Sequence, residues 1–260
     1  MKLTIVGCAG SFAGPDSPAS SYLLQAQHEG RTWNLVLDLG NGALGSLQRF
    51  IDPLAIDAIV LSHLHPDHCA DLSGLHVVLR YHPVHPQTVT VPVWGPVGTD
   101  LRVARAAGVT DEEATQPALL KPEFDFRELA DLTSFTVGPF TVTAHRVNHP
   151  VEAFGLRVEA DGKVLAYTGD TDSTPALTPL LTGADLALAD SAFCDETDDA
   201  EGIHLSGRRA AEAAVTAGGV RRLMLTHIPA WHDREVCRNQ AAAVWPGDVE
   251  LAEPFASYDV

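Results

Sequence analysis

The sequence has few cysteines, and their spacing suits neither cross-linking nor a thiolate metal site. Cys8, Cys69, Cys194 and Cys237 are scattered over 260 residues and form no C-x-x-C pair. We therefore expect neither a disulfide framework nor a thiolate zinc site. Cys69 adjoins a cluster of histidines, but a buried reduced thiol is the expected state of this side chain.

Long apolar runs are also missing. Although 45% of the residues are hydrophobic, no segment approaches the roughly 18 consecutive apolar residues of a membrane span. The opening MKLTIVGCAG is typical of a strand that enters a glycine turn, and its apolar part is too short for a signal peptide. We expect no membrane contact and a cytoplasmic location.

Positive charge is scarce. Lys and Arg number 17 against 34 Asp and Glu, which gives a formal charge of −17. Long-range attraction to a polyanion is unfavourable for such a molecule, and two divalent cations would not reverse the sign. The composition therefore disfavours a large nucleic-acid substrate.

What the sequence does contain is a succession of short strand patterns separated by glycine turns. Two hairpins are expected, turning at Gly138-Pro139 and at Asp161-Gly162. Buried strands are expected over 57–62, 185–190 and 221–228, and helices over 43–51, from 67 onward, over 205–219 and over 233–244. A last strand is expected near 248–251, and residues 98–134 are interpreted as a surface excursion. Two strand-rich halves with flanking helices predict one domain over 1–260, a sandwich of two sheets covered by helices on both outer faces.

The densest chemical feature is the stretch VLSHLHPDHCADLSGL, residues 60–75. His63 and His65 follow a buried strand two positions apart, so their imidazoles point the same way in an extended segment. Asp67 and His68 fall in the first turn of the next helix. Imidazole and carboxylate ligands suit Zn, Mn or Fe. The alternative, a solvated loop, would be richer in Gly, Ser or Lys and would lack the buried strand before it.

A site of two metals needs further ligands, and three candidates close predicted strands. His149 ends FTVTAHRVNH, Asp170 ends VLAYTGD and His227 ends RLMLTH. Ligands gathered at one edge of a sandwich converge. The two oxygens of Asp170 can bridge two cations, which leaves a shared water acidic enough to supply hydroxide at neutral pH.

With these residues in place, the chain resembles the metallo-β-lactamase superfamily, with its H-x-H-x-D-H signature and αββα four-layer sandwich. The resemblance implies two divalent metal ions, Zn²⁺ first and Mn²⁺ or Fe²⁺ as alternatives. It places one ion on His63, His65 and His149, the other on Asp67, His68 and His227, and Asp170 between them. An aspartate in place of a cysteine at the bridging position separates the chain from true β-lactamases.

His204, in GIHLSGRRAAEAA, resembles a histidine of ribonuclease Z-like members that lies beside the metals and assists phosphodiester cleavage. The family has a glutamate as its partner, and the matching position here is Asp190, one methylene shorter. The alternative is that His204 lies at the start of a helix and has no catalytic role. The turn GCAGS with Ser11, and the pair Ser20 and Ser21, also match this branch and are candidate substrate-binding positions.

The resemblance also bears on the substrate. Ribonuclease Z proper carries an arm for transfer RNA between its counterparts of His149 and Asp170, whereas 21 positions and a simple hairpin separate them here. The motifs GCAGSFAGPDSPASSYLL, LSHLHPDHCADLSGL, HLSG and LTHIPAW are similar to those of actinobacterial cyclic-nucleotide phosphodiesterases of this fold. A metal-bridging hydroxide would then attack phosphorus in cyclic AMP, with Asp67 orienting it and His204 protonating the leaving oxygen.

Other functions share these ligands. Precursor-tRNA processing, and lactonase or glyoxalase II-like thioesterase activity, use a nearly identical set, and a non-catalytic metal-binding module would be missing a ligand. Relatives of this kind often dimerise, which leaves a homodimer open. The other histidines are expected to be structural or exposed: His28, His76, His82, His85, His145 and His232.

Overall fold

The structure is a computed structural model and describes residues 1–83, 89–110, 120 and 122–260. His85 and part of the stretch 98–134 lie outside the described residues. Within the described residues, no helix is long and apolar enough to cross a membrane.

The first sheet holds most of the N-terminal half of the chain, in the order β14-β1-β2-β3-β4-β5-β6. Strands β1, β2 and β3 pair antiparallel, whereas β3, β4, β5 and β6 are parallel. Its strands are β1 (Lys2–Gly7), β2 (Ser21–His28), β3 (Arg31–Leu37), β4 (Ala58–Val60), β5 (Val91–Gly95), β6 (Phe124–Glu128) and β14 (Ser257–Asp259).

The second sheet has the order β13-β12-β11-β10-β9-β8-β7. Both predicted hairpins are confirmed, because β7 and β8 join at 138–139 and β9 and β10 join at 161–162. From β10 onward the strands are parallel. The strands are β7 (Ser134–Val137), β8 (Phe140–Arg146), β9 (Phe154–Ala160), β10 (Lys163–Tyr167), β11 (Leu186–Asp190), β12 (Leu223–Thr226) and β13 (Val249–Leu251).

Alternation along the strands builds a core on each side of both sheets. In β11, Leu186 and Leu188 face the layer between the sheets, whereas Ala187 and Ala189 face the outer helices. Ala58 and Val60 of β4 likewise face the central layer, and Ile59 faces outward. Because successive side chains of a strand point to opposite faces, strands buried on both sides become almost wholly apolar.

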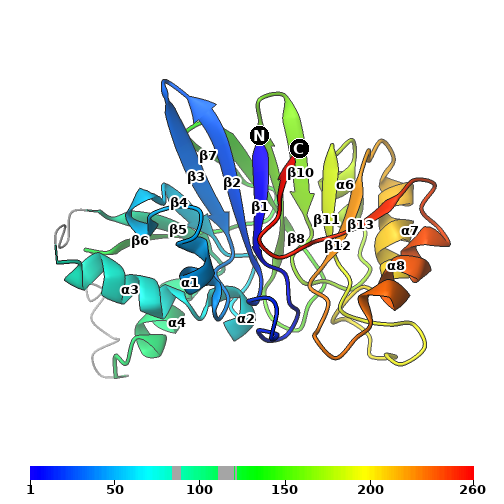
Figure 1. Ribbon diagram of the computed structural model, residues 1–260, viewed down its shortest axis with the longest axis horizontal. Helices are drawn as coiled ribbons and strands as arrows, with labels where there is room; N and C mark the ends of the chain where they lie inside the picture. The colour runs from blue at the N-terminus through cyan, green and yellow to red at the C-terminus, as the bar shows by residue number, and fades with distance from the viewer. Residues whose placement is uncertain (84–88, 111–119, 121) are drawn as a thin grey trace.

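Helices cover the two outer faces (Figure 1). The first sheet carries α1 (Ala43–Leu47), α3 (Leu72–Tyr81) and α4 (Thr99–Ala106); the second carries α6 (Leu177–Leu181), α7 (Gly207–Ala217) and α8 (Arg234–Ala242). The predicted αββα sandwich is confirmed. The two ends of the chain lie side by side, since β1 pairs with β14 (Figure 1).

The structure corrects several local predictions. Two helices, α2 (Pro66–Cys69) and α3, replace the single helix expected from 67 onward. The helix expected over 43–51 ends at Leu47. The stretch 98–134 is not only a surface excursion, because α4 packs on the first sheet and β6 extends it beside β5. Packing against a neighbouring element determines where these helices end and which segments join the sheet. The local sequence pattern does not encode that packing.

Candidate metal centre

Loops that follow strands of both sheets bring the predicted ligands together. His63 and His65 follow β4, and Asp67 and His68 lie in α2, whose first turn begins with Pro66. From the second sheet, His149 follows β8, Asp170 follows β10 and His227 follows β12. His149, Asp170 and His227 therefore lie just after strands, as predicted. The predicted ligands meet where the two sheets face each other.

Three imidazoles form the first set. Nε2 of His63 and Nε2 of His149 lie 3.1 Å and 3.2 Å from Nδ1 of His65. Asp170 Oδ2 lies 3.6 Å from His63 Nε2. One ligand atom from each of these four residues lies within 4.8 Å of the other three.

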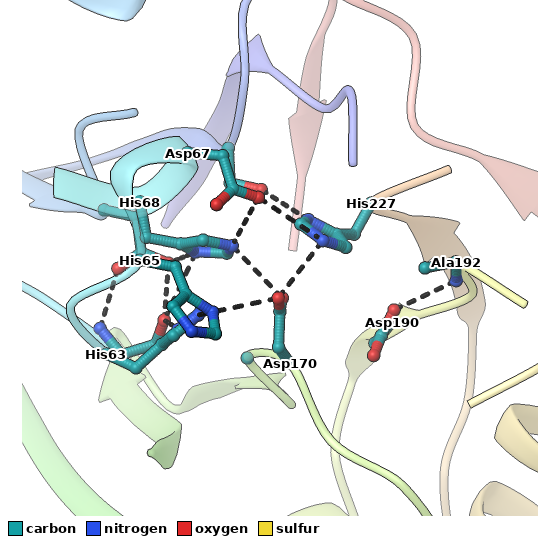
Figure 2. Close-up of polar contacts among 12 residues, drawn as sticks. His63, His65, Asp67, His68, Asp170, Asp190, Ala192 and His227 are labelled. Carbon is teal, nitrogen blue, oxygen red and sulfur yellow. Dashed lines mark hydrogen bonds and ion pairs between the residues drawn. The ribbon is translucent and has the colours of Figure 1, made fainter. Parts of the chain in front are cut away.

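The second set shares Asp170. Its Oδ1 lies 3.2 Å from His68 Nε2 and its Oδ2 lies 3.1 Å from His227 Nε2. Asp67 Oδ2 lies 3.4 Å from His68 Nε2 and 3.7 Å from His227 Nε2. Figure 2 shows the Asp170 carboxylate pointing between the rings of His68 and His227, with Asp67 above them. Asp170 thus belongs to both sets, as a bridging ligand must.

The polar atoms at the centre fit a pair of cations. In the part of the chain that the structure describes, His68 Nε2 and Asp170 Oδ1 are buried without a hydrogen-bond partner, although they point at each other. The Nε2 atoms of His63 and His149 both lie within 3.2 Å of His65 Nδ1, a crowding of acceptor nitrogens that a cation between them would relieve. Nitrogen and carboxylate donors are the ligands that Zn²⁺, Mn²⁺ and Fe²⁺ take.

Hydrogen bonds on the far side of four rings leave Nε2 facing inward. Nδ1 of His63 lies 3.1 Å from Ser62 Oγ, and Nδ1 of His149 donates to the Ile203 carbonyl at 2.8 Å. His68 Nδ1 donates to Asp38 Oδ2 at 2.8 Å. Nδ1 of His227 lies 2.9 Å from Ser20 Oγ. Such partners fix the tautomer and the orientation of a metal-binding histidine.

Burial and neighbouring charges set the protonation of the first set. Burial lowers the pKa of His63, His65 and His149, so these rings are neutral donors at neutral pH. Burial opposes ionisation of Asp170, but its interactions with the neighbouring imidazoles, His227 and His68 first, outweigh burial and hold its pKa well below the ordinary value. Neutral imidazoles and an ionised carboxylate are the forms that bind a metal.

Asp38 supports the candidate centre and is not among the positions that the sequence predicts. Its buried carboxylate accepts from His68 Nδ1, from the N–H and hydroxyl of Ser62, and from the Tyr167 hydroxyl, at 2.7 to 2.8 Å. The signal that could have identified it is an aspartate that closes a buried strand, the same signal that identifies Asp170. The glycines that follow Asp38 indicate only an exit into a helix.

The predicted contact between His204 and Asp190 is present. His204 Nδ1 donates to Asp190 Oδ2 at 3.0 Å, and Asp170 Oδ2 lies 4.0 Å from the same nitrogen. The N–H group of Ala192 donates to the Asp190 carboxylate (Figure 2), as does the N–H group of Thr171, and the two orient it. Burial alone would lower the pKa of His204, but the charge and hydrogen bond of Asp190 raise it to about 9. His204 is thus a cation at neutral pH beside the candidate centre.

The serines occupy different places from those expected. Ser20 and Ser21 are fully buried, so neither side chain is open to a substrate, and the Ser20 hydroxyl supports His227 instead. Ser11 is exposed, and its backbone N–H lies 3.4 Å from His227 Nε2. Of the three serines only Ser11 is exposed, and its role in substrate binding stays a prediction.

Close backbone packing holds the loops that carry these ligands. A Cβ on Gly10 would collide with the carbonyl of His227, and a Cβ on Gly40 would collide with the carbonyl of Asp67. Ser11 and His227 both have positive φ, 63° and 59°. Such left-handed residues cluster at ligand-holding sites, where the surrounding structure over-determines them.

A family model described as the Beta-lactamase superfamily domain matches residues 34–228. The chain belongs to this superfamily. The matched range includes all seven predicted ligands, from His63 to His227, and confirms the family that the sequence resembles. The prediction that the chain is a hydrolytic enzyme of the superfamily is confirmed with it.

Relatives of known sequence cover the whole chain. The uncharacterized protein Rv1339 of Mycobacterium tuberculosis is 42% identical over 261 residues, which span 100% of this chain and 92% of that protein. The probable metallo-hydrolase YhfI of Bacillus subtilis is 28% identical over 97% of both chains. Ribonuclease BN of an Enterobacter strain is 26% identical over 98% of both. The ribonuclease relative supports the ribonuclease Z-like branch.

Solved structures agree on the fold. The crystal structure of YhfI from Bacillus subtilis superposes with a TM-score of 0.84, at 26% identity, over 99% of this chain and 98% of that one. Human tRNase Z, short form, gives a TM-score of 0.76 at 23% identity, over 100% and 99% of the two chains. The sandwich described above is therefore the fold of this superfamily.

Five further histidines that the structure describes belong to neither ligand set. His28 is exposed, and His76 lies 3.8 Å from the buried Glu123. His145 is buried in β8, and His82 is half-buried at the end of α3. His232 Nδ1 contacts Cys194 Sγ at 2.9 Å. All four cysteines are buried and free, and the buried thiol predicted for Cys69 is among them.

Proposed function

We propose that the chain is a two-metal phosphodiesterase that acts on small phosphodiesters, with a 3′,5′-cyclic nucleotide such as cyclic AMP as the substrate. We assign the ligands as part of this proposal: His63, His65 and His149 would hold one divalent cation, Asp67, His68 and His227 would hold the other, and Asp170 would be a ligand of both. When bound, such cations supply an acidified water and neutralise charge on the phosphoryl oxygens.

The observation that carries the proposal is the His204–Asp190 pair beside Asp170. Cleavage of a phosphodiester needs a proton for the leaving alkoxide, and a protonated imidazole is a suitable donor. Asp190 holds Nδ1 of His204 and favours the protonated ring. His204 then donates its Nε2 proton to the leaving 3′-oxygen, while Asp67 orients the attacking water.

Three features favour a small phosphodiester over transfer RNA. Between His149 and Asp170 the chain holds β9, β10 and their short connections, which leave no room for an arm. The match to ribonuclease BN runs over 312 aligned positions, more than the 260 residues here, so that protein has insertions that this chain lacks. A net charge of −17 also opposes a polyanion.

A ribonuclease is the alternative that a specific observation favours, because ribonuclease BN is a relative over the full chain. A thioesterase expels a thiolate, which leaves without a proton from His204, whereas a lactonase expels an alkoxide and could use that proton as a phosphodiesterase does. A panel of substrates separates these classes: cyclic AMP, bis-p-nitrophenyl phosphate, a precursor tRNA, an acyl-homoserine lactone and S-lactoylglutathione, each with zinc- or manganese-loaded protein.

We expect turnover of cyclic AMP and of bis-p-nitrophenyl phosphate. His204→Ala should keep its metals and lose about 10²- to 10⁴-fold in kcat, the effect of removing a general acid. His28→Ala is the matched control and should behave as the parent, because His28 is exposed and lies at the opposite end of β2 from Ser20. Turnover of the lactone or thioester without either phosphodiester would contradict the proposal.

A further inference from the structure

An exposed aromatic pair beside the candidate centre has no role in the mechanism above. Phe12 and Trp231 are 39% and 63% exposed, and their ring centroids lie 4.9 Å apart with an interplanar angle of 33°. Single exposed apolar side chains are ordinary, whereas neighbouring large rings left in solvent mark a binding surface. Chain segments from the two ends of the sequence bring these rings together.

Both rings stand on loops that meet at His227. Phe12 follows Ser11, whose N–H lies 3.4 Å from His227 Nε2. The N–H of Gly10 donates to the carbonyl of Ile228 at 3.3 Å, and the Cβ position of Gly10 is filled by the His227 carbonyl. Trp231 is four residues beyond His227, so it lies within about 14 Å of that ligand along the chain.

The Trp231 loop is also fixed on its other side. The N–H of His232 donates to the Pro229 carbonyl at 2.9 Å, and His232 Nδ1 contacts Cys194 Sγ at 2.9 Å. Cys194 adjoins Phe193, whose ring packs edge-on against His204 with centroids 5.1 Å apart. The loops that carry the aromatic pair are therefore connected to His227 and, through Cys194 and Phe193, to His204.

We propose that Phe12 and Trp231 form the subsite for the nucleobase of the substrate. This inference rests on the proposed function, since it places the base of the nucleotide whose phosphodiester lies at the centre. A base has two apolar faces and stacks on aromatic side chains without regard to charge, which suits a molecule as acidic as this one. Stacking area also favours purines over pyrimidines, so the pair selects cyclic AMP or cyclic GMP over cyclic CMP.

The test compares a nucleotide with the same cyclic phosphate lacking a base. Trp231→Ala and Phe12→Ala should raise KM for cyclic AMP by about 5- to 150-fold, the effect of losing one stacked base. The kcat should stay within about twofold, because neither ring is assigned a role in the bond-breaking step. KM for ribose 3′,5′-cyclic phosphate should not change, and Trp231→Phe should retain most of the affinity.

Tyr81→Ala is the matched control, because Tyr81 is an aromatic residue 67% exposed on α3, remote from His227 in sequence. It should have the parent KM for both substrates. Equal changes in KM for the two substrates, or no change in the Trp231 and Phe12 variants, would overturn the base subsite while leaving the phosphodiesterase proposal standing.

A binding measurement separates the two proposals. AMP should quench tryptophan fluorescence of the metal-loaded full chain, and Trp231→Phe should abolish that response while Tyr81→Ala keeps it. Quenching without turnover of any phosphodiester would support the subsite and refute the function. If Trp231→Ala instead converts a dimer to a monomer in sedimentation velocity with KM unchanged, a second copy covers the pair and the subsite is wrong.

Discussion

Four of the five imidazoles in the two ligand sets have their orientation set by a second partner, and Asp38 is the partner of His68. It is fully buried at the end of β3 and bonds Ser62, His68 and Tyr167 together. Its own backbone is left-handed, with φ of 57°. A carboxylate that accepts a hydrogen bond from the far nitrogen of a metal-binding histidine fixes the tautomer and orientation of that ring, and so affects metal affinity.

Asp38→Asn should lower the affinity of the second ligand set for a divalent cation. The amide has one acceptor oxygen where the carboxylate has two, so His68 loses the partner that fixes its tautomer. We expect divalent-cation affinity to fall about 10- to 100-fold, measured by competition with a chromophoric chelator. Asp57→Asn is the control, since Asp57 bonds Arg31 and the Asn34 N–H on the same sheet, away from the centre. Equal losses in both variants would assign Asp38 to the fold alone.

Asp190→Asn should change the pH dependence of the reaction. In the parent, Asp190 raises the pKa of His204 to about 9, so the ring is protonated at neutral pH and the acid is lost as pH rises through that value. Without the charge the pKa of His204 falls, and the basic limb of the kcat profile should move to lower pH. Asp190→Glu should restore it. Superimposable basic limbs in parent and Asn variant would show that His204 is not the acid.

At the scale of elements, the site depends on loops that touch through bare backbone. Gly10 packs against the carbonyl of His227 and Gly40 against that of Asp67, so the glycines let a loop approach a ligand-bearing segment. The Gly10 approach joins the first loop of the chain to the loop after β12, although more than 200 residues separate them.

Gly10→Ala should therefore displace His227. The added methyl group meets a backbone carbonyl that cannot rotate away, so we expect a loss of one bound cation and destabilisation by about 1–3 kcal/mol, as for an overpacked interior. Gly45→Ala is the matched control: it lies in α1 with open space around its Cβ, and should stabilise by up to about 1 kcal/mol. Urea unfolding and metal analysis would measure both. A Gly10 variant with full metal content would contradict the packing argument.

The elements that the sequence predicts best are those whose ends carry local signals. The turns at Gly138-Pro139 and Asp161-Gly162 define two hairpins, and positions at the ends of predicted strands identify His149, Asp170 and His227 as candidate ligands. The break between α2 and α3 and the edge strands β6 and β14 carry no such signal, because pairing with a distant neighbour creates them. Burial of Ser20 and Ser21 is likewise a property of the packed loops. The extent of the single predicted domain stays a prediction.

At the scale of the whole molecule, the ligand sets join the two sheets. His63, His65, Asp67 and His68 come from the first sheet, and His149, Asp170 and His227 come from the second. A cation bound by residues of both sheets is lost when the sandwich opens, so binding contributes directly to the free energy of unfolding.

Chelation should therefore destabilise the fold. A cation whose free concentration is 100 times its Kd adds about 2.7 kcal/mol to the free energy of unfolding. EDTA should remove that contribution from each occupied site. Urea unfolding with and without EDTA measures it. His149 follows a strand of the second sheet and belongs to the first ligand set. His149→Ala should therefore reduce the loss of unfolding free energy that EDTA causes. An unfolding midpoint indifferent to EDTA would show that no cation joins the sheets.

We propose that two cations sharing Asp170 act together on a phosphodiester. The most direct test is the rate of cyclic AMP hydrolysis by metal-free protein as divalent cation is added back, with bound metal counted per chain. We predict little hydrolysis until the second site fills, full rate at two cations per chain, and none at any loading for Asp170→Asn. Hydrolysis by the metal-free chain, or a protein with two bound cations and no phosphodiesterase activity, would contradict it.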